Sequence, residues 1–164
     1  MKVLILFAVV LSAGSVFAKT LETRCIKNDC FRFGWMTTEP STDYQLTCTC
    51  TDGDCMNVGW ESADNRNSTF SVECKVGGCF TKGWKSVQND NGMVLIDIVT
   101  CKSDSCLTHG WDIAASYGPG GEVICKNSDC HQFGGISFWR GKISETFCIN
   151  SNCYRSGWVA EIDE

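Results

Sequence analysis

The sequence predicts an all-β protein built from six tandem β-hairpin repeats of about 24 residues, each stapled by its own disulfide. Three observations predict this fold class. A cysteine motif recurs six times, turn-forming residues lie between the paired cysteines, and strand-like segments lie next to the motifs.

The repeated motif is Cys, four residues, Cys, three residues, Gly and Trp. Its first cysteines are 23 to 27 residues apart: Cys25, Cys50, Cys74, Cys101, Cys125 and Cys148. Five units match fully, whereas the fifth has Gly135 in place of tryptophan and its own Trp139 four residues later. A period of this length is typical of repeat architectures in which each unit packs on its neighbours.

The segments around each motif predict a hairpin. The residues between the cysteines are mostly Asn, Asp, Ser and Gly, which favour tight turns. Strand-like segments precede three of the pairs, at 93–100, 121–124 and 143–147. In such a hairpin the two cysteines face each other within the reach of a disulfide. We therefore expect local bridges, although a ladder of bridges between successive repeats stays open: Cys25–Cys30, Cys50–Cys55, Cys74–Cys79, Cys101–Cys106, Cys125–Cys130 and Cys148–Cys153.

The residues after the second cysteine are expected to form the outgoing strand. Alternation along that strand puts the first of them on the same face as the tryptophan; these first residues are Phe31, Met56, Phe80, Leu107, His131 and Tyr154. We expect the glycine before each tryptophan to let a disulfide or a neighbouring ring approach the backbone.

Three arrangements of the hairpins remain open: a linear solenoid-like stack, a closed ring, or a β-trefoil of three double units. All three place residues 19–164 in a single cysteine-rich β-hairpin repeat domain.

Residues 1–18 are interpreted as a signal peptide, with a short apolar run followed by small residues at the cleavage site. We therefore expect a secreted, extracellular protein. All 13 cysteines follow this segment, and cysteines in an oxidising compartment form disulfides. The segment carries Lys2, so the mature chain has 13 basic and 19 acidic residues. This acidic balance disfavours nucleic acid as a partner, and no apolar run predicts membrane insertion.

The tryptophans are candidate ligand-binding aromatics, because an indole offers a large contact area for a sugar ring or a partner. The alternative is a repeated core residue that packs one hairpin on the next. The set consists of Trp35, Trp60, Trp84, Trp111 and Trp158.

No metal site, cofactor or catalytic residue is predicted. Zinc was considered because two cysteine pairs have a nearby histidine, His109 or His131, but the secretory route oxidises thiols. Calcium needs about six to eight oxygen ligands, and the loop at 75–78 has no acidic residue. Neither histidine is accompanied by a nucleophile or a paired carboxylate, so the expectation is a protein that is not an enzyme.

Two single residues carry further predictions. Cys48 is the odd cysteine, which indicates an intermolecular disulfide and a homodimer, or else a buried free thiol or a shuffled local pairing. Asn67 begins the sequon Asn67-Ser68-Thr69 and is predicted to carry an N-linked glycan.

The leading functional hypothesis is a secreted, non-enzymatic binding module for an extracellular carbohydrate or protein. One alternative is a structural component of a matrix or coat, cross-linked through Cys48. Another is a secreted inhibitor or toxin-like effector whose reactive loop would lie within residues 85–100, the longest connection.

Overall fold

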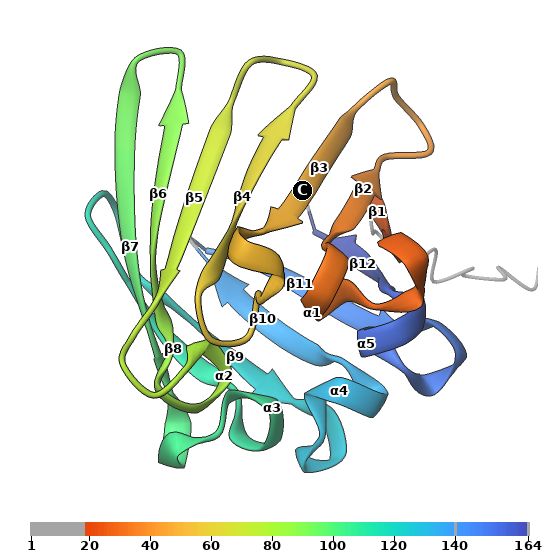
Figure 1. Ribbon diagram of the computed structural model, residues 1–164, viewed down its shortest axis with the longest axis vertical. Coiled ribbons are helices and arrows are strands. Elements are labelled where there is room, and N and C mark those ends of the chain that lie inside the picture. Colours follow the sequence, from red (N-terminus) through yellow and green to blue (C-terminus); the bar gives the residue numbers. More distant parts are fainter. Residues whose placement is uncertain (1–18, 140, 164) are drawn as a thin grey trace, which may run out of the picture.

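A computed structural model describes residues 19–139 and 141–163, where twelve antiparallel strands form one closed barrel (Figure 1). The predicted signal peptide lies outside the described residues. The strands are β1 (Lys19–Cys25), β2 (Trp35–Thr38), β3 (Gln45–Cys50), β4 (Gly59–Asp64), β5 (Thr69–Cys74), β6 (Trp84–Asp90), β7 (Met93–Cys101), β8 (Trp111–Ala115), β9 (Gly121–Cys125), β10 (Gly135–Trp139), β11 (Lys142–Cys148) and β12 (Trp158–Ile162).

The closed ring is the arrangement found, and the linear stack and the β-trefoil are wrong. Strands that follow one another in sequence are neighbours all the way round, and β1 pairs with β12 from Lys19↔Ile162 to Thr23↔Trp158. A linear stack would leave unpaired backbone groups on its first and last strands, which closure removes.

Each unit is a pair of strands joined at one end by its disulfide loop. Five loops begin with a 3₁₀ turn: η1 (Ile26–Asn28), η2 (Thr51–Gly53), η3 (Lys102–Asp104), η4 (Lys126–Ser128) and η5 (Ile149–Ser151). Five contain a short helix: α1 (Cys30–Phe33), α2 (Cys79–Lys82), α3 (Cys106–His109), α4 (Cys130–Phe133) and α5 (Cys153–Ser156). These helices contact one another in succession along one end of the barrel (Figure 1).

The prediction that a strand begins directly after the second cysteine is wrong. The residues after the second cysteine are helical in five units, and the strand begins at or next to the tryptophan. The first cysteine pairs with that tryptophan in the ladder, as in Cys25↔Trp35, and not with the second cysteine. Capping side chains stabilise three of these helices: Asp29, Asp129 and Asn152 accept hydrogen bonds from backbone N–H groups in the first turn. The helices α2 and α3 have no such cap.

The six local disulfides are present as predicted, with Cα–Cα distances of 4.5–4.7 Å. The residues between the cysteines form tight turns, as their composition predicts. Two consecutive residues in each of five loops adopt a positive φ of 47–71°, a conformation that Gly, Asn and Asp tolerate better than most residues: Lys27 and Asn28, Asp52 and Gly53, Ser103 and Asp104, Asn127 and Ser128, and Asn150 and Ser151.

The glycine before each tryptophan position is required by the next unit's backbone. All six have a positive φ, and a Cβ at each would lie 1.9–2.2 Å from a carbonyl oxygen of a neighbouring strand. The expected approach of a disulfide or a ring is therefore wrong, because a main-chain carbonyl occupies that space. The facing pairs are Gly34 and Cys48, Gly59 and Val72, Gly83 and Val99, Gly110 and Val123, Gly134 and Thr146, and Gly157 and Thr23.

Candidate functional site

The five repeat tryptophans line a single cavity of about 650 Å³. Each lies at or next to the start of the second strand of its unit, and strand alternation then places every second residue on the same face. Along β6, for example, Trp84, Ser86 and Gln88 all line the cavity, whereas Lys85 is exposed on the other face. The tryptophans therefore belong to the inner face of the barrel.

The indoles form a continuous series of ring contacts. The centroids of Trp35 and Trp60 are 5.3 Å apart, with an interplanar angle of 62°. The contacts continue at 5.6–5.8 Å in the order Trp158, Trp35, Trp60, Trp84, Trp111. Strands two places apart in a sheet are separated by about 10 Å. The rings therefore lean inward from the barrel wall until they meet, and we call this series the tryptophan arc.

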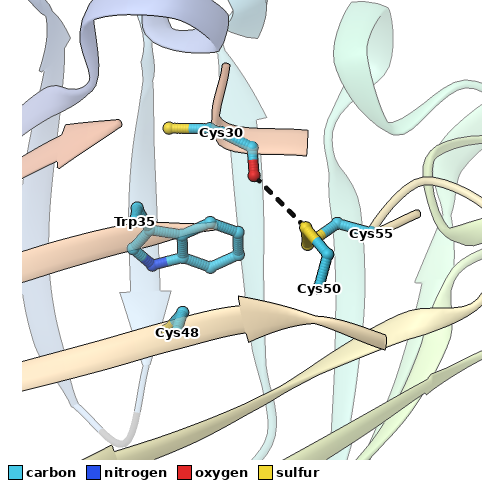
Figure 2. Packing of buried hydrophobic residues seen from close by; sticks show 5 residues of the cluster. All are labelled: Cys30, Trp35, Cys48, Cys50 and Cys55. Carbon is cyan, nitrogen blue, oxygen red and sulfur yellow. Dashed lines mark hydrogen bonds between the residues drawn. A yellow bond between two sulfur atoms is a disulfide. The ribbon is translucent and has the colours of Figure 1, made fainter. Parts of the chain in front are cut away.

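Trp35 is the most buried member of the arc, with 9% of its surface exposed. It packs in a cluster with four cysteines, and Figure 2 shows its indole between Cys30 and Cys48, beside the Cys50–Cys55 disulfide. The other four tryptophans are half-buried. The two interpretations of the tryptophans are thus compatible, because the same rings pack against one another and form the wall of a cavity.

Side chains from the disulfide loops line the helical end of the cavity. Phe31 contacts Phe80 at 4.5 Å and Tyr154 at 4.9 Å between ring centroids, and His131 contacts Tyr154 at 5.6 Å. The sequence grouped these residues with the tryptophans, and they do share the cavity, although they reach it from helices. Met56, of the same group, is not among the lining residues and is 37% exposed, so the prediction is wrong for the second unit. His109 instead lies on an exposed part of α3, so the two histidines are in different environments.

Several polar side chains line the cavity on the strands beside and after the tryptophans, farther from the disulfide loops. Among them are Ser86, Gln88 and Asp97. The hydroxyl oxygen of Ser137, another lining residue, lies 3.0 Å from that of Ser144 on the paired strand. The cavity therefore has a wall that is mostly aromatic and aliphatic with a few polar side chains.

Sequence reasoning missed several lining residues, including Phe70 and Ile113, and it noted Trp139 only as the displaced tryptophan of the fifth unit. Trp139 lies on β10 at the second inward position after Gly135. Its ring packs over Gly121, where a Cβ would lie 2.8 Å from the indole. Alternation counted from the tryptophan position identifies Ile113 on β8 and Trp139 on β10 once the strand start is known, whereas Phe70 lies on β5, which has no tryptophan.

Cys48 lies on β3 opposite both Trp35 and Ser62, with 2% of its surface exposed and no disulfide partner. Burial raises the pKa of its thiol to about 11, and a hydrogen bond with Ser62 offsets part of that rise. The predicted disulfide to a second chain would require this part of the barrel wall to open. The homodimer stays a prediction.

The other predicted positions have clear places in the fold. Asn67 is exposed in the turn between β4 and β5. Residues 85–100 form most of a regular hairpin, β6 and β7, with a two-residue Asn91-Gly92 turn. Over the described ranges, His, Cys, Asp and Glu side chains form no group of three or more that is arranged to hold a metal ion.

Comparison with known proteins finds no matching family model, no similar curated protein and no similar solved structure. In the part of the chain that the structure describes, none of the helices has the length and apolar character needed to cross a membrane. Six intramolecular disulfides are consistent with an oxidising, extracellular environment.

Proposed function

We propose that this protein is a secreted, non-enzymatic binding protein that holds a small ligand inside its barrel. The observation that carries the proposal is the cavity of about 650 Å³ lined by the tryptophan arc. Small-molecule sites in proteins are concave, mostly apolar and about 300–1,000 Å³ in volume, with a few polar groups that orient the ligand. The cavity agrees with each of these properties.

The inward direction of the indoles favours a small ligand over a protein surface or a long glycan. A row of tryptophans on the outside of the barrel would suit an extended partner. Here the rings are tilted against one another at 57–62° and face the interior. A ligand must therefore enter the barrel to contact them, which limits it to the size of the cavity.

The disulfide loops support this role by holding the rim of the cavity in place. Each bridge closes a loop of only a few residues and restrains the short segment that carries the next tryptophan. A preformed site loses less conformational entropy when it binds its ligand.

The experiment compares two phenylalanine substitutions on β6 in the oxidised mature protein. Ser86→Phe adds a ring to the inner face, whereas Lys85→Phe adds the same ring to the outer face. The probe is N-phenyl-1-naphthylamine, whose fluorescence rises in an apolar site. We expect saturable binding to the unaltered protein and to Lys85→Phe, and at least tenfold weaker binding to Ser86→Phe.

Two results contradict the proposal. One is the absence of saturable binding to the unaltered protein. The other is equal binding to the two variants, because the probe would then lie outside the barrel.

A further inference from the structure

The tryptophan arc is interrupted at one of its six positions. The strand order places Gly135 between the strands of Trp111 and Trp158, at the position that a tryptophan holds in the other units. The cavity extends to Gly135 and to Gly134 before it. We call this space at the interruption the Gly135 gap.

The backbone conformation at this position does not call for a glycine, because Gly135 has no positive φ. A Cβ at Gly135 would lie 2.9 Å from the carbonyl oxygen of Ile124, so a side chain there needs the backbone to shift. The clash is smaller than the 2.1 Å approach at Gly134, which also has a positive φ. Gly135 therefore differs from the glycines that every unit has before its tryptophan position.

Trp139 does not take the place of the missing indole. Its Cα pairs with Gly121, whereas Gly135 pairs with Cys125 at the disulfide end of the same two strands. Its indole packs over Gly121. Trp139 thus borders the cavity deeper in the barrel, and the gap remains part of the cavity.

The walls of the gap suit a flat aromatic ring. A Cβ at Gly135 would lie 3.3 Å from a methyl of Val123 and 3.4 Å from the sulfur of Cys130. Trp111 packs against the cluster that Val123 and Cys130 form with Cys125, and it borders the gap on one side. Sulfur and indole both make favourable contacts with an aromatic ring.

We propose that the ligand of this cavity contains a planar, uncharged bicyclic aromatic group that inserts into the Gly135 gap. This inference rests on the proposed function and adds the chemical class of the ligand. The inserted ring takes the place of the sixth indole and packs between Trp111 and Trp158. The hydroxyl of Ser137, two residues along β10, lies on the same face; it already shares a hydrogen bond with Ser144, and a remaining lone pair can accept one from a polar substituent.

The test uses two probes with one carbon skeleton, 2-naphthol and decahydro-2-naphthol, measured by titration calorimetry at pH 7. Both are uncharged and carry one hydroxyl, and only 2-naphthol is planar. We expect 2-naphthol to bind the unaltered protein at least tenfold more tightly. Gly135→Trp, which completes the arc, should weaken 2-naphthol binding at least tenfold. Ile136→Trp adds an indole to the opposite face of β10 and should change the affinity by less than twofold.

Contacts to Gly135 provide a second readout that needs no variant, in case Gly135→Trp does not fold. We expect intermolecular nuclear Overhauser effects between 2-naphthol and the α protons of Gly135. Equal affinities for the two probes, unchanged binding to folded Gly135→Trp, or the absence of these effects overturns the inference. If Ser86→Phe still blocks N-phenyl-1-naphthylamine, the proposed function survives that result; if no probe binds, both fail.

Discussion

The α-carbon of Gly157 lies against the carbonyl oxygen of Thr23, so that a Cβ at Gly157 would be 2.0 Å from that oxygen. Gly157 belongs to the last unit and Thr23 to the first. The same contact joins every other unit to its successor at 1.9–2.2 Å. The first and last units therefore meet in the way that all neighbouring units meet, and the ring has no special closing element.

This contact predicts a large effect of Gly157→Ala on stability. The methyl group would collide with backbone, and the residue would also keep its positive φ of 93°. Gly118→Ala is the matched control, because Gly118 has a φ of 82° and no atom within 4 Å of its added Cβ. We expect a loss of about 1–2 kcal/mol in the free energy of unfolding for the control, from φ alone. For Gly157→Ala we expect more than about 3 kcal/mol. Urea unfolding of the oxidised proteins measures both, and equal losses would contradict the role of the carbonyl contact.

The tryptophan arc predicts an asymmetry between adjacent residues of β2. Trp35→Ala removes a buried ring that packs against two other indoles and should cost about 3–5 kcal/mol. Met36→Ala on the outer face, where Met36 is 38% exposed, should cost less than about 1 kcal/mol. Acrylamide should quench the emission of the unaltered protein less than that of the unfolded chain. Similar losses for the two variants would mean that the arc contributes little to the core.

Burial of Cys48 predicts a thiol that is present but slow to react. In the native protein, 5,5′-dithiobis(2-nitrobenzoate) should label it slowly at pH 8, because it is 2% exposed and its pKa is raised to about 11. In denaturant one thiol per chain should react at once. A disulfide-linked homodimer would give no reactive thiol under either condition and a doubled mass on a non-reducing gel.

The same pKa predicts how stability depends on pH. The folded state holds the Cys48 proton up to about pH 11, whereas the ordinary thiol value is 9.0. The contribution is therefore complete below pH 9 and is lost as the pH rises toward 11, by at most about 1.4 kcal/mol per pH unit. Cys48→Ala lacks this titration, so the gap in unfolding free energy between the two proteins should narrow from pH 8 to pH 10. A constant gap would contradict the raised pKa.

The exposed turn between β4 and β5 predicts glycosylation of Asn67 when the chain passes through a eukaryotic secretory pathway. A mass increment should be present that an amidase specific for N-glycans removes. Thr69→Val should abolish the increment by destroying the sequon, while Asn67 keeps its turn conformation at a φ of 67°. Persistence of the increment in Thr69→Val would place the glycan elsewhere.

The sequence predicted the disulfide within each unit but missed the short helices and the contacts that depend on two units. The disulfides could be predicted because each joins cysteines five residues apart. The helix at Cys30–Phe33 was missed because four residues are too few to show a period, although Asp29 before it is a good N-cap residue. Gly34 was identified as special, but its partner, the Cys48 carbonyl, belongs to the next unit and could not be seen from the motif.

The candidate site shows the same division. The sequence offered the tryptophans as repeated packing residues or as ligand-binding aromatics; the structure places them in mutual contact along one cavity, and ligand binding stays a prediction. Whether the tryptophans face a cavity or the outer surface depends on the pairing of β1 with β12, which closes the barrel. The turn composition of a single repeat does not determine that pairing. Once β1 pairs with β12, the inner face is the only enclosed one, and Gly135 becomes a gap in a ring and not simply an imperfect repeat.

The locality of the disulfides has a consequence for the order of events during synthesis. A chain with 13 cysteines has a very large number of wrong pairings, yet each native partner is only five residues away. If the protein is secreted as proposed, each unit can be oxidised as it emerges from the translocation channel, before later cysteines are present to compete. Cys48 lies two residues before Cys50. In the second unit, therefore, a third cysteine is close enough in sequence to form a wrong disulfide with a member of the native pair, Cys50–Cys55. Closure of β1 onto β12 is the single step that must wait for the end of the chain.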